Sequence, residues 1–162
     1  MHAHYERTNT LIPMKRILLV DDEPAILQTL RIILASEGYE VEAAWSSKEA
    51  WDLLNQHDFD LVVTDFNMPG MKGDELAFRI KESWPAIPVV LLTASAEIMQ
   101  ASGRALPGVE VLLGKPFDLT EFRHEIARLL VKQAVPATTA REETWSDQPQ
   151  GEPVLAGAAE IR

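Results

Sequence analysis

Four sets of polar residues, each at the end of a short apolar run, are the candidates for chemistry in this sequence. In chain order they are the acidic residues Asp21, Asp22 and Glu23, then Asp65, then Thr93, and last Lys115. Asp65 follows the run LVVT (61–64), and a charge at the end of a buried strand is costly unless another group compensates it. We therefore expect the four sets to meet in the folded chain.

Phosphoryl transfer is the chemistry that suits these residue types. Crowded carboxylates raise one another's pKa, and a divalent cation removes that penalty. Mg²⁺ prefers oxygen ligands and is commonly held by one or two carboxylates together with phosphate oxygens. An aspartate can itself be the nucleophile and form an aspartyl phosphate, and an ammonium and a hydroxyl supply donors to the transferring group. Acyl and hydride transfer fit this set less well.

Each residue also has an ordinary structural interpretation. Asp21 and Asp22 fit the N-terminal region of a helix, where acidic side chains are favoured by the helix dipole. Asp65 precedes a Pro-Gly loop and suits a turn, Thr93 is a common strand residue, and Lys115 alone carries little information. The four sets in order are more informative than any one of them. The histidines show no metal-ligand spacing and are interpreted as surface residues: His2, His4, His57 and His124.

The segments that position these residues alternate between apolar runs typical of strands and apolar residues at helical spacing. Short apolar runs, typical of strands, cover residues 16–20, 41–45, 60–64, 88–93 and 109–113. Helical periods lie between these runs, and a fifth, which includes Phe122, follows the last run. The second period begins with a Ser46–Glu49 capping box, and the fourth runs from Ile98 and Met99 to Leu106 with an interruption at Gly103. This order predicts an α/β fold with a doubly wound parallel sheet. The runs at 41–45 and 109–113 alternate in polarity and are expected nearer the edges.

Composition limits the classes of function. The net charge of −10 argues against binding to nucleic acid or to an anionic membrane, and the absence of cysteine excludes disulfides and thiolate sites. No apolar run is long enough to span a membrane and no signal peptide is recognisable, so we expect a cytoplasmic protein.

The predicted organisation has three parts. Residues 1–14 form a flexible leader in which Met14 is an alternative start, residues 15–133 form the folded domain, and residues 134–162 form a disordered acidic tail. Within the tail, Trp145 or the later VLAG is a candidate docking motif, although a solvated tail is the simpler interpretation.

Four sequence blocks resemble the receiver domain of two-component response regulators. They are ILLVDDEP (17–24), LVVTDFNMPGMKG (61–73), VVLLTA (89–94) and GKPF (114–117), in the family's order and with similar spacing. The resemblance covers about residues 15–133. It implies the flavodoxin-like (βα)₅ fold with strand order 2-1-3-4-5.

The resemblance also implies a role for each site residue. Asp65 would accept the phosphoryl group from a phosphohistidine, with Lys115 binding the phosphoryl oxygens and Thr93 sensing them. Mg²⁺ would be held by Asp22, by Asp65 and by the backbone carbonyl of Asn67, with Asp21 acting through water. A cis Lys115–Pro116 peptide is expected as well.

One position departs from the family pattern. An aromatic residue usually stands three positions before the lysine, where its movement couples to the threonine; this chain has Leu112 there. Phosphoryl capture is expected to survive, since Leu112 touches no phosphate, but readout by an aromatic switch is in doubt. The predicted switch residues are therefore Thr93 and Leu112.

The resemblance leaves several outputs open. The first is a stand-alone receiver, phosphorylated by a sensor histidine kinase or a histidine phosphotransfer protein, that signals to an unknown downstream protein without binding DNA. The alternatives are a phosphate shuttle or sink and a phosphorylation-independent interaction module. An aspartyl-phosphate hydrolase is disfavoured because Asn67 stands where that class has a second aspartate, so no turnover enzyme is expected. By family analogy, the face of the fourth helix, fifth strand and fifth helix is expected to read out phosphorylation, with Arg104, Leu112 and Phe122, and a homodimer is possible through it.

Overall fold

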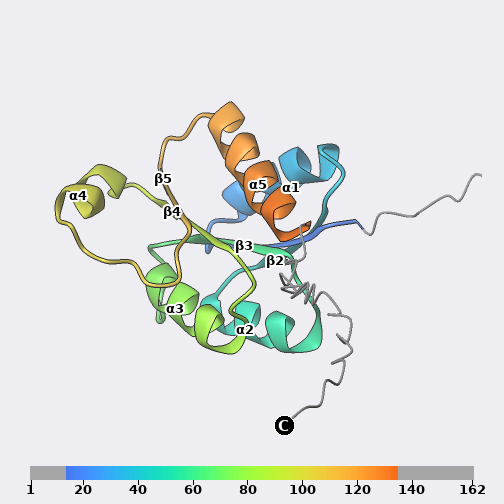
Figure 1. Ribbon diagram of the computed structural model, residues 1–162, viewed down its shortest axis with the longest axis horizontal. Helices are drawn as coiled ribbons and strands as arrows, with labels where there is room; N and C mark the ends of the chain where they lie inside the picture. Colours follow the sequence, from blue (N-terminus) through green and yellow to red (C-terminus); the bar gives the residue numbers. More distant parts are fainter. Residues whose placement is uncertain (1–13, 135–162) are drawn as a thin grey trace, which may run out of the picture.

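Five parallel strands alternate with five helices in residues 14–134, the part of the chain that the computed structural model describes (Figure 1). The strands are β1 (Arg16–Val20), β2 (Glu40–Ala44), β3 (Leu61–Asp65), β4 (Val89–Thr93) and β5 (Val111–Gly114). The helices are α1 (Pro24–Ser36), α2 (Ser47–Gln56), α3 (Gly73–Ser83), α4 (Ala96–Ala101) and α5 (Leu119–Ala134). Apart from Met14 and Ala134, the predicted leader and tail lie outside the described residues.

The strand order β2-β1-β3-β4-β5 confirms the predicted doubly wound sheet. The two strands with alternating polarity, β2 and β5, are its edges, where one face of a strand is less completely covered. The register aligns Val20 with Thr64, and Asp65 with Leu92. The strand ends that carry the polar residues therefore lie side by side at one edge of the sheet.

Helices cover both faces of the sheet. Along β1, Ile17 and Leu19 pack in the core under α1 and α5, whereas Leu18 and Val20 pack in the core under α2 and α3. Figure 1 shows these two helix pairs on opposite sides of the sheet, with α4 beyond the β4–β5 end. Because successive strand residues point to opposite faces, a strand covered on both sides reads as a continuous apolar run.

The fourth helix is shorter than predicted. It ends at Ala101, and Leu106 lies in the loop that leads to β5. Gly103 adopts φ +63°, the left-handed conformation that commonly ends a helix. The periodicity of Ile98 and Met99 was correctly assigned to a helix, but the glycine stops that helix rather than interrupting it.

The first turn of α2 contains the expected capping interactions. The Ser46 hydroxyl accepts a hydrogen bond from the Glu49 N–H at 3.2 Å. The Glu49 carboxylate accepts one from the N–H of Trp45, at 2.8 Å and one residue earlier than in the usual capping box. Both contacts are local, which is why the sequence was sufficient to predict where this helix begins.

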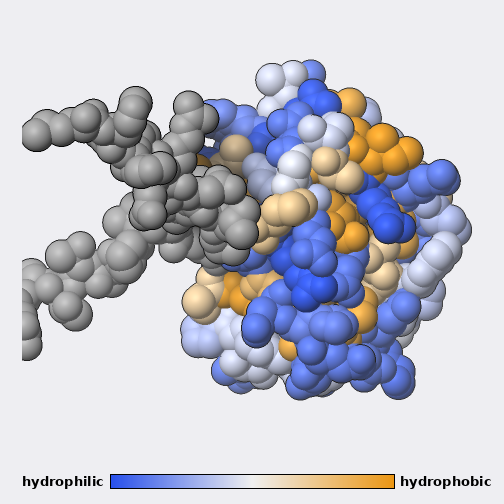
Figure 2. Space-filling model, turned by 90° about the vertical axis from the view of Figure 1, so that its right-hand side faces the viewer, coloured by the Kyte–Doolittle hydropathy of each residue, from blue (hydrophilic) through white to orange (hydrophobic). Residues whose placement is uncertain are grey.

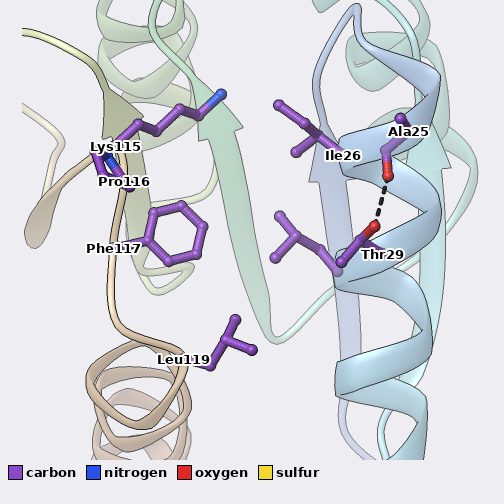
Figure 3. Close-up of a pocket in the computed structure, with 8 residues that line it drawn as sticks. Ala25, Ile26, Thr29, Lys115, Pro116, Phe117 and Leu119 are labelled. Atoms are coloured by element: carbon purple, nitrogen blue, oxygen red, sulfur yellow. Dashed lines mark hydrogen bonds between the residues drawn. The ribbon is translucent and has the colours of Figure 1, made fainter.

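The segment that joins β5 to α5 passes alongside α1. The Lys115–Pro116 peptide is cis, as the family resemblance implied. Lys115, Pro116 and Phe117 lie across from the first turns of α1 (Figure 3). Asp118 then caps α5: its carboxylate accepts hydrogen bonds from the N–H groups of Thr120, at 2.7 Å, and Glu121, at 3.1 Å.

The cap at Asp118 predicts a pH dependence of stability. Its backbone hydrogen bonds, first that from Glu121, lower the pKa of Asp118 below the ordinary aspartate value. The stabilisation is therefore complete above the ordinary pKa and is lost as pH falls through the lowered pKa of the folded state. Urea unfolding from neutral to acidic pH should show wild type losing stability relative to Asp118→Asn, which keeps an acceptor at every pH. Asp58→Asn, at an exposed aspartate, is the control, and equal acid sensitivity of wild type and Asp118→Asn would contradict the assignment.

The surface of the described chain mixes polar and apolar side chains. On the face drawn in Figure 2, hydrophobic residues form separate patches among hydrophilic ones. None of the helices within residues 14–134 combines the length and apolar character needed to cross a bilayer.

Candidate functional site

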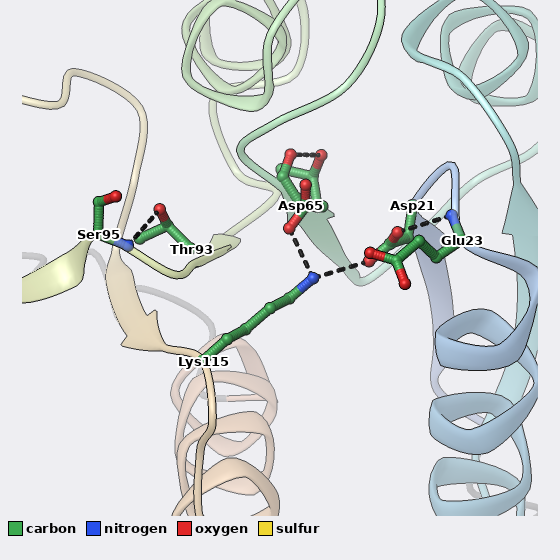
Figure 4. A network of polar contacts seen from close by, with 7 residues as sticks. Asp21, Glu23, Asp65, Thr93, Ser95 and Lys115 are labelled. Carbon is green, nitrogen blue, oxygen red and sulfur yellow. Dashed lines mark hydrogen bonds and ion pairs between the residues drawn. The ribbon is translucent and has the colours of Figure 1, made fainter.

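Asp21, Asp65 and Lys115 meet at the carboxyl ends of the strands (Figure 4). The Lys115 ammonium lies 2.7 Å from Oδ1 of Asp65 and 3.1 Å from Oδ2 of Asp21. Both aspartates are buried, with residue exposures of 7% and 2%. The lysine reaches them from the loop after β5, and its side chain retains 20% exposure. The ammonium thus contacts both buried carboxylates and compensates part of their charge, as the position of Asp65 required.

Asp22 completes an acidic cluster that fits a divalent cation. Carboxylate oxygens of Asp21, Asp22 and Asp65 lie within 4.8 Å of one another, and Asp22 is on the exposed side. When all three carboxylates are ionised, Lys115 leaves two negative charges uncompensated. A hard divalent cation matches that charge and prefers such an all-oxygen donor set, so these residues fit Mg²⁺.

The surroundings shift the pKa of two groups. Burial raises the pKa of Asp21, and the hydrogen bond from the Glu23 N–H (2.9 Å) and the Lys115 ammonium oppose this only in part. For Lys115, burial is the largest single influence and tends to lower the pKa, but the hydrogen bonds to Asp65 and Asp21 and their charges together outweigh it. The pKa of Lys115 is therefore raised, and the ammonium stays protonated at neutral pH.

Backbone contacts fix the carboxyl end of β3. The Phe66 N–H donates to the carbonyl of Leu92 at 2.8 Å, which extends the pairing with β4 beyond Asp65. The Gly73 N–H donates to the carbonyl of Phe66 at 3.0 Å and closes the loop between β3 and α3. A Cβ on residue 73 would lie far inside van der Waals distance of the Asp65 carbonyl oxygen. Only glycine lets α3 begin this close to the strand.

The role of Gly73 was missed in the sequence analysis, although Gly73 ends the block LVVTDFNMPGMKG. A second glycine in a turn-rich block is a common signal for loop flexibility. Here the requirement is close approach instead, and it becomes visible only when the strand and the helix are placed together.

Thr93 ends β4, on the strand beside Asp65, and is 1% exposed. Its hydroxyl oxygen accepts a hydrogen bond from the Ser95 N–H at 3.1 Å. That contact leaves the hydroxyl proton available to another acceptor. In Figure 4, Thr93 and Asp21 lie on opposite sides of Asp65.

Asn67 and Leu112 occupy different surroundings. Asn67 lies exposed in the loop two residues after Asp65, and Leu112 is half-buried in β5, where it pairs with Leu91. The roles predicted for the Asn67 carbonyl and for Leu112 as a switch stay predictions.

The expectation that Phe122 contributes to an interaction face is wrong. Phe122 is fully buried, with 0% exposure, and stacks on Phe117 with ring centroids 5.3 Å apart. On α5, Phe122 belongs to the core cluster that α1 and α5 form with the sheet, and it does not face solvent. Arg104 is exposed, as expected, but it pairs with Asp74 in the first turn of α3 at 2.7 Å, a contact that the sequence did not suggest.

Comparison with known proteins gives one consistent family. The model of the response regulator receiver domain matches residues 17–127. The transcriptional regulatory protein GlrR of Escherichia coli is 38% identical over 131 residues, which are 81% of this chain and 29% of that protein. The response regulator MprA of Mycolicibacterium vanbaalenii is 34% identical, over 82% of this chain and 58% of its own length. The chain thus spans less than two thirds of these curated relatives.

Solved structures agree with this result. A CheY-like receiver domain protein from Methanospirillum hungatei is 30% identical and superposes with a TM-score of 0.69, over 75% of this chain and 97% of that one. The response regulator TrrA from Thermotoga maritima, solved in complex with Mg²⁺ and BeF, is 34% identical with a TM-score of 0.64, over 72% and 99% of the two chains. With the family model covering most of the chain and the strand order of CheY-like proteins, this chain belongs to the response regulator receiver domain family.

Proposed function

We propose that Asp65 accepts a phosphoryl group from a phosphohistidine on a sensor histidine kinase or a histidine phosphotransfer protein. The observation that carries this proposal is the convergence of Lys115 on Asp65 and Asp21, beside the oxygen cluster completed by Asp22. Membership of the receiver family supports it further.

The proposed step is an in-line displacement at phosphorus. A carboxylate oxygen of Asp65 forms the new P–O bond, and the P–N bond of the phosphohistidine breaks. The other ring nitrogen of the phosphohistidine carries a proton, so the electron pair of that bond leaves with a neutral imidazole. The Lys115 ammonium donates to the phosphoryl oxygens, and Thr93 donates its free hydroxyl proton to them. Asp22, Asp65 and the backbone carbonyl of Asn67 would hold Mg²⁺, with Asp21 acting through water, and the bound ion would supply positive charge that stabilises the phosphoryl oxygens.

We further propose that the chain is not a turnover enzyme. Fast hydrolysis of an aspartyl phosphate needs a general acid or base near the leaving oxygen, and the residue two positions after Asp65 is Asn67, which cannot serve. The aspartyl phosphate is then a persistent state, lost only by slow autodephosphorylation.

The proposed output is a changed contact with another protein, as part of two-component signalling in the cytoplasm. Phosphorylation adds negative charge at the end of β3, and Thr93 and the loop after it respond. One proposed form of this output is a homodimer through α4, β5 and α5, in which Arg104 and Leu112 lie at the interface and the buried Phe122 does not. Two curated relatives are named DNA-binding transcriptional regulators, of which this chain spans about a quarter. The absence of DNA binding and the stand-alone role therefore stay predictions, as does the alternative of a phosphate shuttle or sink.

The test uses a small phosphodonor and intact mass. Purified protein is incubated with acetyl phosphate, with and without Mg²⁺. A Mg²⁺-dependent gain of one phosphoryl group supports the proposal. If no gain occurs although Mg²⁺ is bound and beryllofluoride fails to bind, the interaction-module alternative is favoured.

Binding of Mg²⁺ gives a prediction that needs no phosphodonor. Titration followed by NMR should show saturable binding, and Asp22→Asn should weaken it by at least about tenfold, since even residues that only orient metal ligands contribute that much. Asp58→Asn, which removes an exposed carboxylate far from the cluster, should bind as wild type does. Equal affinity of Asp22→Asn and wild type would contradict the assignment of Asp22.

A further inference from the structure

An apolar groove lies beside the site, between α1 and the segment that leads from Lys115 into α5 (Figure 3). Its volume is about 390 Å³, and its apolar lining residues include Ile26, Pro116, Phe117 and Leu119. Leu119 is 43% exposed at the lower end of the groove. Covering such a surface with an apolar side chain removes it from water, which is favourable.

Thr29 and Lys115 are the polar side chains among the residues that line the groove. The Thr29 hydroxyl donates its proton to the carbonyl of Ala25 at 2.8 Å, and the oxygen keeps lone pairs that can accept a hydrogen bond. A flat side chain with a single N–H donor matches an apolar groove of this kind. Among the natural side chains that describes the indole of tryptophan, which has a large apolar body and one donor.

We propose that the groove is occupied by Trp145 of this same chain. Trp145 is the only aromatic residue in the sequence after Ala134, and polar residues flank it on both sides. Burying the indole while its neighbours stay in water is the arrangement that this pattern favours. The interpretation of Trp145 as a docking motif thereby gains a defined docking surface.

The connection is long enough to reach the groove. Helix α5 has 16 residues, so it is about 24 Å long at 1.5 Å per residue. Trp145 lies eleven residues after Ala134, and an extended segment of that length spans about 36 Å. A chain that turns back at the end of α5 can therefore run along the helix and place Trp145 beside Leu119.

The charges on α5 and before Trp145 also favour a chain that runs back along α5. Arg123, one turn after Leu119 on α5, pairs with Glu37 at the end of α1 through a 3.2 Å contact, and both side chains are more than 40% exposed. Exposed pairs of this kind contribute little, so the guanidinium can accept a further carboxylate at low cost. Glu142 and Glu143 precede Trp145 by three and two residues, and a returning chain carries them past Arg123.

Spin labelling of the full chain tests the docking without phosphoryl chemistry. The chain has no cysteine, so Ser146→Cys carries a nitroxide at a single position next to Trp145. The expected result is selective loss of amide NMR intensity at residues 25–30 and 117–119, restored when the nitroxide is reduced. Absence of this loss, or its appearance mainly around α2 and α3, would overturn the proposal.

Two further variants of the spin-labelled chain identify which side chain occupies the groove. Adding Trp145→Ser should restore the groove intensities, whereas Val154→Ser, which removes an apolar residue elsewhere in the same segment, should leave the loss unchanged. Persistence of the loss in Trp145→Ser would refute the role of the indole. A mixture of isotope-labelled wild type with spin-labelled, unenriched protein should show no loss; a loss in the mixture would assign the groove to a second copy instead.

Discussion

Asp65→Asn is expected to abolish phosphorylation completely. Wild-type protein incubated with acetyl phosphate and Mg²⁺ should gain one phosphoryl group by intact mass, and the variant should gain none. The amide keeps the size of the carboxylate, so it can occupy the same place at the end of β3, but its oxygen is a far weaker nucleophile than a carboxylate oxygen. The loss should therefore be chemical and not a consequence of unfolding.

The stability of Asp65→Asn provides the internal check. The substitution removes one of three crowded carboxylates, and it also removes the charge partner that lies 2.7 Å from Lys115. We expect a cooperative thermal transition and unchanged far-ultraviolet circular dichroism. Asp58→Asn, an exposed site far from the cluster, should be phosphorylated as wild type is. A full phosphoryl gain in folded Asp65→Asn would show that another residue is the acceptor.

Gly73→Ala is expected to damage both stability and phosphorylation. Residue 73 is not in the left-handed region, so an alanine there meets no conformational penalty of its own. Its Cβ would instead collide with the Asp65 carbonyl oxygen and lie 2.8 Å from Cδ1 of Leu91. Because the first obstacle is backbone, either β3 or the start of α3 must move. Overpacking of this kind typically costs about 1–3 kcal/mol, and urea unfolding measures it.

The same displacement should slow phosphorylation of the folded Gly73→Ala protein. Asp65 would shift relative to Lys115, and misplacement of a reacting group by about 1 Å can cost up to about 100-fold in rate. The measurement is the initial rate of phosphoryl gain per folded molecule.

Gly38→Ala is the matched control. Gly38 has φ +90° and lies in the turn between α1 and β2, where a Cβ would meet no other atom within 4 Å. Alanine there is strained by its backbone conformation, at a cost of about 1–3 kcal/mol, yet it disturbs nothing near Asp65. Comparable destabilisation in the two variants, with slower phosphorylation only in Gly73→Ala, separates the local effect from the global one. Equal phosphorylation rates would show that the contact of α3 with β3 does not position the site.

The sequence alone was sufficient for the fold class and for the edge at which the site lies. Strands buried on both faces must be apolar at nearly every position, so β1, β3 and β4 appear as continuous runs. The polar residues that follow such runs are then forced to one edge of a parallel sheet. The capping interactions of α2 could also be predicted from the sequence, because Ser46 and Glu49 are three residues apart and interact within one turn.

The sequence determined the ends of the helices and the faces that they bury less fully than it determined the fold class. The period of α5 identified Phe122 as apolar, and the core that the helix covers decided that the ring is buried at 0% exposure rather than presented to a partner. The end of α4 depends on the backbone conformation of Gly103, since the same residue type can also be tolerated within a helix.

Contacts between distant segments were decided by the tertiary structure alone. Lys115 meets Asp21 across 94 residues, Arg104 meets Asp74 across 30, and Gly73 is required by a carbonyl group on the preceding strand. The sequence determined which residues could do chemistry, because residue type and local period are properties of short segments. Their distances, burial and pKa shifts depend on how the helices pack against the sheet, because packing brings together groups that no local pattern relates.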